Sequence, residues 1–285
     1  MASQKASLLA STLVLSNGCK IPRIRFNLHM RDGTTKWVRY ALREGYRGFD
    51  CTRKHGNGRE AGTAILDFLN SRDNTAGLRR EDIFVTQQIG SKRSSRNREV
   101  AYEHIKKTVD DSGLGYIDLF LTHSAHGGRG PWSALEKAVK DGLVRMAGLG
   151  NHSVSQIQAV LSWKTSLKPV VNQIETRRVN TQLDIREFCI RNGIGVTAGP
   201  PLSKAVNKRD PAVLELAKKH SCTPAQLYLK FALNGTGLVT LCGVPEQQEL
   251  IENLDVANLD ISREDIQALQ AADMSYGKRA AQPAH

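Results

Sequence analysis

The sequence predicts an α/β fold, a single (β/α)8 barrel of the TIM type with a β-hairpin at its N-terminus. Short apolar segments alternate with helical patterns along the whole chain, and eight of these segments have the length of strands. Near-continuous apolar strands separated by helices indicate parallel strands that are buried on both faces. The length of 285 residues suits one barrel of about 250 residues with little added. We therefore expect residues 1–285 to form one domain.

The predicted strands follow a hairpin. Leu13–Leu15 and Lys20–Ile21 flank the dipeptide Asn17-Gly18, which favours a tight turn, and we expect this hairpin to cap the barrel floor. The eight barrel strands are then predicted at Arg23–Leu28, Arg47–Cys51, Ile83–Ile89, Ile117–Thr122, Val144–Leu149, Pro169–Ile174, Gly195–Ala198 and Leu238–Cys242.

Helical patterns separate these strands. Glu99–Asp111 repeats apolar residues at helical spacing, and Pro211–Lys219 reads as a second helix. A third helix, Pro224–Leu233, is preceded by Thr223, which suits an N-cap with proline at the first helical position.

The charge favours anionic partners. The chain carries 40 Lys and Arg against 28 Asp and Glu, a net charge of +12. The densest basic run, Lys92 to Arg98, has no interleaved aromatic residue, and a single-strand binder would need such residues for base stacking. We therefore expect a solvated loop that borders the barrel mouth. The predicted partner is a small molecule, anionic if this charge steers it, and no nucleic acid.

Membranes and disulfides are not predicted. No apolar run approaches the roughly 20 residues of a membrane span. The five cysteines are odd in number and form no C-x-x-C pair, which is typical of reduced thiols and a cytoplasmic location. We expect a monomer or a weak dimer.

The candidate site is selected by a rule of barrel architecture, because chemistry in such barrels occurs at the C-terminal ends of the strands. Asp50 and His55 follow the second strand, Gln88 the third and His123 the fourth. The other polar or glycine positions at strand ends are His29, Asn151, Gln173, Glu175, Gly199 and Gly243. The histidines come from different strands without an H-x-H or H-E-x-x-H motif, so we predict no metal.

Nine segments of the sequence resemble motifs of a known family. The matching segments are Leu15–Pro22, Gly45–Asp50, Gly56–Glu60, Arg80–Thr86, Tyr116–His123, Gly148–Asn151, Val171–Glu175, Thr223–Gln226 and Ile251–Leu254. In this order and spacing they make the chain similar to the aldo-keto reductases over nearly its whole length. The resemblance implies hydride transfer from NADPH to a carbonyl, with a tyrosine as acid beside a lysine, an aspartate and a histidine.

The resemblance breaks at catalytic positions. It assigns the aspartate to Asp50 and the histidine to His123, but His55 stands at the tyrosine position and Gln88 at the lysine position. Both the implied proton donor and the residue that tunes it are therefore replaced.

The implied cofactor positions change as well. Gly199 stands where the family stacks a tyrosine on nicotinamide, and Gly150 replaces the serine of a Ser-Asn pair, while Asn151 and Gln173 remain. The phosphate clamp is replaced by a glycine variant at Gly243, and the resemblance places Asn253 near the cofactor. After the first strand Arg25 stands at a glycine position, where it could fill vacated cofactor space or anchor an anionic substrate.

These losses favour a non-redox reaction. Asp50, His55 and His123 could form a general acid/base set for dehydration, isomerisation, cyclisation or lyase chemistry on a small carbonyl or hydroxyl compound, as in specialised metabolism. Gln88 would bind the substrate or an oxyanion, while His29, Arg25 and His126 would line the pocket. In this interpretation no cofactor is needed.

Two alternatives stay open. One is an NADPH-dependent carbonyl reductase with an altered catalytic tetrad, and the other is a non-catalytic pseudoenzyme. His55 is also compatible with an ordinary loop residue.

Overall fold

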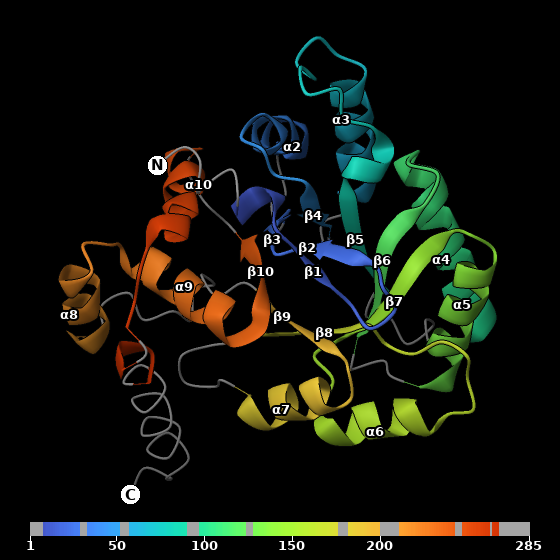
Figure 1. Ribbon diagram of the computed structural model, residues 1–285. Coiled ribbons are helices and arrows are strands. Elements are labelled where there is room, and N and C mark those ends of the chain that lie inside the picture. Colours follow the sequence, from blue (N-terminus) through green and yellow to red (C-terminus); the bar gives the residue numbers. More distant parts are fainter. Residues whose placement is uncertain are drawn as a thin grey trace, which may run out of the picture.

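Eight parallel strands close into a barrel in the computed structural model, which describes residues 8–28, 33–51, 57–89, 97–123, 128–175, 182–199, 211–242, 247–262 and 264–267 (Figure 1). The strands are β3 (Ile24–Asn27), β4 (Gly48–Asp50), β5 (Phe84–Gln88), β6 (Ile117–His123), β7 (Val144–Gly150), β8 (Val171–Glu175), β9 (Gly195–Gly199) and β10 (Gly237–Cys242). They follow chain order around the barrel, and β10 closes onto β3. The predicted (β/α)8 class and its eight strands are confirmed.

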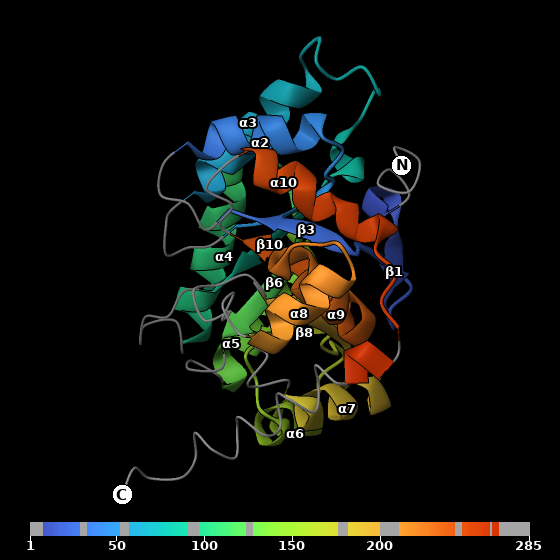
Figure 2. The ribbon, with the colours of Figure 1, turned by 90° about the vertical axis from the view of Figure 1, so that its left-hand side faces the viewer.

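Helices surround this barrel (Figures 1 and 2). Their bounds are α2 (Thr34–Arg43), α3 (Gly58–Leu69), α4 (Arg98–Ser112), α5 (Arg129–Lys140), α6 (Val154–Ser162), α7 (Leu183–Arg191), α8 (Pro211–Lys219), α9 (Pro224–Thr236) and α10 (Gln247–Leu254), with 3-10 turns η2 (Arg80–Asp82) and η5 (Asp255–Asn258). Thr223 caps α9 as predicted, because its hydroxyl accepts the Gln226 N–H at 3.2 Å. In the part of the chain that is described, none of these helices has the length and apolar character needed to cross a membrane.

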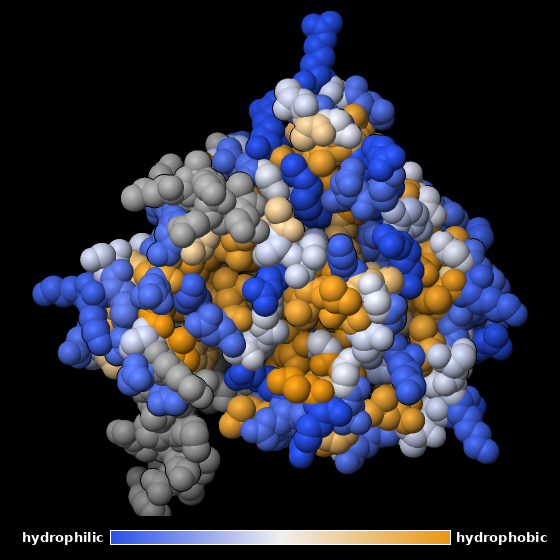
Figure 3. All heavy atoms as spheres, in the orientation of Figure 1, coloured by the Kyte–Doolittle hydropathy of each residue, from blue (hydrophilic) through white to orange (hydrophobic). Residues whose placement is uncertain are grey.

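The hairpin consists of β1 (Thr12–Val14) and β2 (Lys20–Pro22), paired antiparallel with Leu13 opposite Ile21. Ile21 is fully buried and Leu15 nearly so, in one apolar cluster with Phe84 and Leu238 at the starts of two barrel strands. The hairpin therefore closes the N-terminal end of the barrel, as predicted. Figure 3, in the orientation of Figure 1, shows apolar side chains grouped near the centre of the face on which the hairpin lies.

The main core lies between the strands and the helices. Phe26 on β3 points outward, and its ring centroid lies 6.1 Å from that of Trp37 and 6.0 Å from that of Tyr46. Because strand side chains alternate, the neighbours Arg25 and Asn27 point into the barrel. This alternation decides which β3 side chains reach the site.

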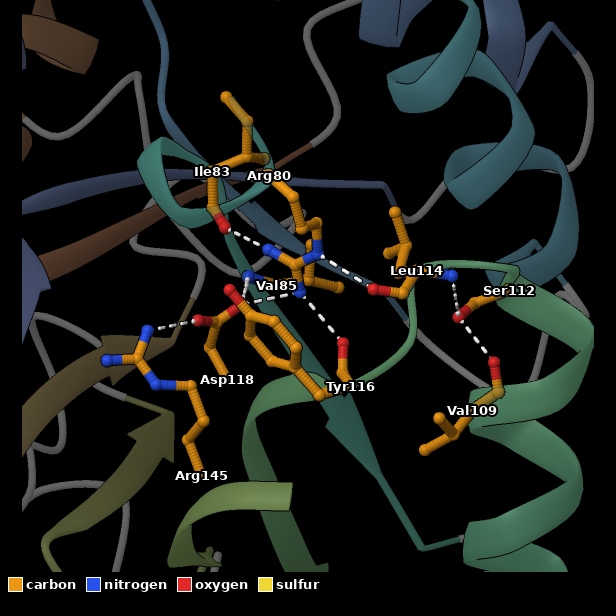
Figure 4. A network of polar contacts seen from close by, with 9 residues as sticks. All are labelled: Arg80, Ile83, Val85, Val109, Ser112, Leu114, Tyr116, Asp118 and Arg145. Carbon is orange, nitrogen blue, oxygen red and sulfur yellow. Dashed lines mark hydrogen bonds and ion pairs between the residues drawn. The ribbon is translucent and has the colours of Figure 1, made fainter. Parts of the chain in front are cut away.

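A polar network secures the N-terminal ends of β5, β6 and β7 (Figure 4). The buried carboxylate of Asp118 accepts hydrogen bonds from Arg80 Nη2 at 2.9 Å, Arg145 Nη1 at 3.1 Å and the Val85 N–H at 2.9 Å. Both guanidinium groups also lie over the Tyr116 ring, at 4.1 Å for Arg80 and 5.7 Å for Arg145. These contacts join three strands at the end of the barrel opposite the candidate site.

Candidate active site

Four predicted site residues lie on successive strands. Arg25, Asp50, Gln88 and His123 belong to β3, β4, β5 and β6, which are neighbours in the barrel. Asp50, Gln88 and His123 are the last residues of their strands, so they lie at the C-terminal end of the barrel. The predicted residues that fall outside the described part of the chain are His29, His55, His126 and Gly243.

The predicted cofactor residues are divided between the barrel rim and an outer helix. Asn151 follows β7 with a positive φ of 56°, and its N–H donates to the Gln173 carbonyl of β8 at 2.8 Å. Gly199 is buried at the end of β9. Asn253 is buried in α10, which packs against α9. Asn151, Gln173 and Gly199 therefore share the rim with the catalytic candidates.

Arg25 and Asp50 form a buried ion pair inside the barrel. Arg25 Nε lies 2.9 Å from Asp50 Oδ1, and the side chains are 1% and 4% exposed. The pair is therefore shielded from the water and salt that weaken surface ion pairs. The guanidinium therefore lies among protein groups inside the barrel, and the idea that Arg25 fills vacated cofactor space stays a prediction. A role of Arg25 in anchoring an anionic substrate stays a prediction.

Arg25 has partners on three sides. Its Nη1 donates to the Pro22 carbonyl and its Nη2 to the Thr197 hydroxyl of β9, both at 3.3 Å. Its aliphatic stem crosses Gly48, where an added Cβ would lie 2.5 Å from Arg25 Cγ. The absence of a side chain at Gly48 thus makes room for the arginine, which is held at every nitrogen.

The second carboxylate oxygen of Asp50 accepts a hydrogen bond from Gln173, one of the predicted cofactor-binding residues. Gln173 Nε2 donates to Asp50 Oδ2 at 3.0 Å, although the two residues are 123 positions apart. Since an ionised carboxylate only accepts hydrogen bonds, this contact identifies the donor end of the Gln173 amide. The opposite end, Oε1, has no donor among the described residues.

Gln88 turns toward β7. A Cβ added at Gly150 would lie 2.6 Å from Gln88 Nε2 and 3.2 Å from the Thr122 carbonyl. The glutamine amide therefore occupies the space that a side chain at position 150 would need. The two departures from the family pattern, Gln88 and Gly150, are sterically matched to each other.

Two histidines lie beside this rim. His123 is partly exposed and is paired in register with Gly150. His152 is buried, and its Nδ1 lies 3.1 Å from the Gly150 carbonyl, so Nδ1 carries the proton. Burial lowers the pKa of His152 to about 4, against the opposing effect of the Gly150 hydrogen bond, and His123 contributes a smaller lowering. His152 is therefore neutral near pH 7, whereas the His123 imidazole is partly exposed at the rim.

Two further polar residues flank Asp50 and were missed from the sequence. Asn27 and Thr86 are the register partners of Asp50 on β3 and β5. Both are buried, and neither Asn27 Oδ1 nor Thr86 Oγ1 has a hydrogen-bond partner in the described structure. Strand alternation was the available signal, because Asn27 is two residues from Arg25 and Thr86 two residues from Gln88.

The arrangement combines a fixed charge pair with neutral hydrogen-bonding groups. Asp50 is engaged by Arg25 and Gln173, so it contributes a fixed acceptor, while His123 contributes a partly exposed imidazole at the rim. Within the described residues, no group of three His, Cys, Asp or Glu side chains is placed to hold a metal ion. The described part of the site therefore offers a buried ion pair, amide groups and one imidazole at the same end of the barrel.

Comparisons with known sequences give one family. The model of the aldo/keto reductase family matches residues 29–274. An uncharacterized oxidoreductase of Schizosaccharomyces pombe is 32% identical over 94% of this chain and 96% of its own length. Glyoxal reductase of Bacillus subtilis is 28% identical, covering 92% of this chain and 93% of its own length.

Solved structures agree with the fold. Aldose reductase of Schistosoma japonicum aligns with a TM-score of 0.80 and 30% identity over 92% of each chain. An aldo-keto reductase of Bombyx mori, solved in complex with NADP, aligns with a TM-score of 0.80 over 92% of each chain at 24% identity.

Proposed function

The chain belongs to the aldo/keto reductase family, and on that premise we propose that it reduces a small carbonyl compound to an alcohol with NADPH as the hydride donor. The named relatives are oxidoreductases, which favours this alternative over the non-redox reaction that the sequence suggested. The expectation that no cofactor is needed gains no support from these relatives. An NADP complex of a protein with the same fold favours NADPH.

One observation carries the proposal. The residues that the resemblance assigns to catalysis and to nicotinamide binding are physically joined at one rim, because Gln173 donates to Asp50 and Asn151 donates to the Gln173 carbonyl. His123 adjoins them through its pairing with Gly150.

The described groups fit a nicotinamide. Gln173 has an unengaged Oε1 among the described residues, and Asn151 is anchored by its backbone N–H on the Gln173 carbonyl. Asn151 and Gln173 would hold the carboxamide, and NADPH would supply hydride to the carbonyl carbon.

The proton for the nascent alkoxide comes from a histidine in this proposal. Asp50 is committed to Arg25 and Gln173, and the low pKa of His152, about 4, keeps it neutral. His123 is partly exposed at the rim and carries an imidazole, the side chain that most often serves as a general acid or base in enzymes. His55, which stands at the family's tyrosine position, is the competing donor and lies outside the described residues.

A non-redox acid/base reaction is the second candidate. The observation that favours it is the pairing of Asp50 with buried Arg25 while Gln88 turns to Gly150, because this leaves no cation at the position of the family's lysine. The same histidines would then move protons without hydride transfer.

The deciding experiment measures NADPH oxidation with an aldehyde panel that includes glyoxal, together with NADPH binding by tryptophan fluorescence. His123→Gln and His55→Gln are compared with His220→Gln, a histidine after α8 that pairs with Asp265. We expect the variant that lacks the proton donor to have a kcat about 10²- to 10⁴-fold lower than the wild type and to retain NADPH binding. The kcat of His220→Gln should stay near that of the wild type.

Three results decide between the candidates. Oxidation of NADPH with formation of alcohol supports the reductase. Absence of both NADPH binding and oxidation refutes it. Conversion of a hydroxy-carbonyl compound without NADPH establishes the second candidate.

A further inference from the structure

We infer that Arg25 is a positioning residue that acts together with Asp50 on the direction of the Gln173 amide. Arg25 requires residue 50 to turn an acceptor inward, and the second carboxylate oxygen of Asp50 accepts from Gln173 Nε2, so that Gln173 presents its carbonyl oxygen to the ligand. The complementary ligand group is an N–H or O–H donor. The ligand named here rests on the proposed function, whereas the direction of the amide does not.

The chain of contacts is short and buried. Arg25 Nε holds Asp50 Oδ1 at 2.9 Å, and Gln173 Nε2 holds Asp50 Oδ2 at 3.0 Å. Arg25 is fully buried and Asp50 is 3% exposed, whereas Gln173 is partly exposed. The order is thus a fixed cation inside, a carboxylate between and an amide at the rim.

Arg25 can act only as a hydrogen-bond donor toward residue 50. A guanidinium has only donors, and its Nη1 and Nη2 are held by the Pro22 carbonyl and the Thr197 hydroxyl. Gly48 leaves room for its stem and no more, since a Cβ there would lie 2.5 Å from Arg25 Cγ. Residue 50 must therefore always turn an acceptor toward Arg25.

The substitution Asp50→Asn makes this control visible. The introduced asparagine has the shape of aspartate but carries one acceptor and one donor group. With Arg25 present, the oxygen of the new side chain must face Arg25 Nε, so its NH2 must face Gln173. Gln173 then has to turn its Oε1 inward and its NH2 toward the ligand. Asp50→Asn therefore reverses the Gln173 amide, so that the rim offers the ligand a donor where it had offered an acceptor, while the side-chain shape at position 50 stays the same.

Removal of Arg25 removes this requirement. In the double variant Arg25→Met/Asp50→Asn, residue 50 is free to turn its oxygen to Gln173, and no unpaired charge stays buried. The original direction of the Gln173 amide becomes available again. The effect of Asp50→Asn should thus depend on Arg25, which a merely structural salt bridge would not produce.

The experiment uses the full chain labelled with ¹⁵N-glutamine. The Gln173 side-chain signal is identified by its loss in Gln173→Met, and its hydrogen exchange is measured together with NADPH affinity by fluorescence. We expect a protected signal in the wild type, loss of protection and an affinity about tenfold weaker in Asp50→Asn, and recovery to within about threefold in the double variant.

Asp118→Asn is the matched control, because Asp118 is another buried, arginine-paired aspartate, at the opposite end of the barrel (Figure 4). It should leave the Gln173 signal and the affinity unchanged.

The inference is overturned if Asp50→Asn keeps the protected Gln173 signal, or if a folded double variant does not recover it. If the double variant does not fold, the signal in Asp50→Asn alone decides. A wild type that shows no NADPH binding refutes the proposed function, and the exchange measurement then still tests the direction of the amide.

Discussion

Replacement of Asp118 by asparagine should destabilise the fold by about 2–3 kcal/mol. The carboxylate is 1% exposed and receives three donors, Arg80, Arg145 and the Val85 N–H. Asparagine oriented with its oxygen at the Oδ2 position keeps the Arg80 and Val85 contacts but turns an NH2 group toward Arg145. The loss has two parts: the buried Arg80 and Val85 hydrogen bonds lose their charge assistance, since bonds to charged groups are worth about 1.5–3 kcal/mol, and the new NH2 group lies against the donor of Arg145.

Arg145→Met provides the comparison. The Arg145 side chain is 47% exposed, so its contribution should stay below about 1 kcal/mol. In the Arg145→Met background, Asp118→Asn should cost less than in the wild type, because the clash of two donors is gone. Urea unfolding followed by circular dichroism measures all four proteins. A loss below about 1 kcal/mol for Asp118→Asn, or equal losses for both single variants, would refute this reasoning.

Three further predictions concern the rim and one helix. Gly150→Ser should displace the Gln88 amide and cost about 1–2 kcal/mol in urea unfolding, because its Cβ would lie 2.6 Å from Gln88 Nε2; Gln88→Ala in the same background should recover part of the loss, and no recovery would contradict the steric match. The pKa of His152 is about 4 in the folded protein, below the usual value of about 6.5, so the unfolded chain binds the proton first. This lowered pKa contributes about 3 kcal/mol to the free energy of unfolding above pH 6.5, and the contribution is lost as the pH falls toward 4. The free energy of unfolding should therefore depend less on pH between 6.5 and 4 in His152→Gln than in the wild type, and an equal dependence on pH would speak against this assignment. Thr223→Ala should cost about 1 kcal/mol of thermal stability through the lost bond to the Gln226 N–H, while Thr223→Ser should stay near wild type; a neutral alanine variant would show that the cap is dispensable.

Local patterns were sufficient for much of the fold. The apolar segments predicted every barrel strand, and the hairpin and the N-cap at Thr223 follow from residues that are neighbours in sequence. The architectural rule for barrels also placed Asp50, Gln88 and His123 correctly at strand ends. These features depend on periodicity, turn chemistry and capping, which act over a few residues.

The function was less accessible. Loss of the tyrosine and lysine positions suggested non-redox chemistry, whereas the relatives of the chain favour a reductase. A substitution at a catalytic position shows which group is gone but not which neighbour has taken over its contact.

The sequence by itself determined an eight-stranded barrel and placed Asp50, Gln88 and His123 at the ends of its strands. Only the tertiary structure decided their partners: Arg25 pairs with Asp50, Asp50 with Gln173 across 123 residues, and Gln88 turns to Gly150. The physical reason is that closure of the barrel brings side chains from distant strands into one interior, where space and unpaired charge select the contacts. A glycine at position 48 makes room for an arginine on the neighbouring strand, and that complementarity exists only after both strands have paired.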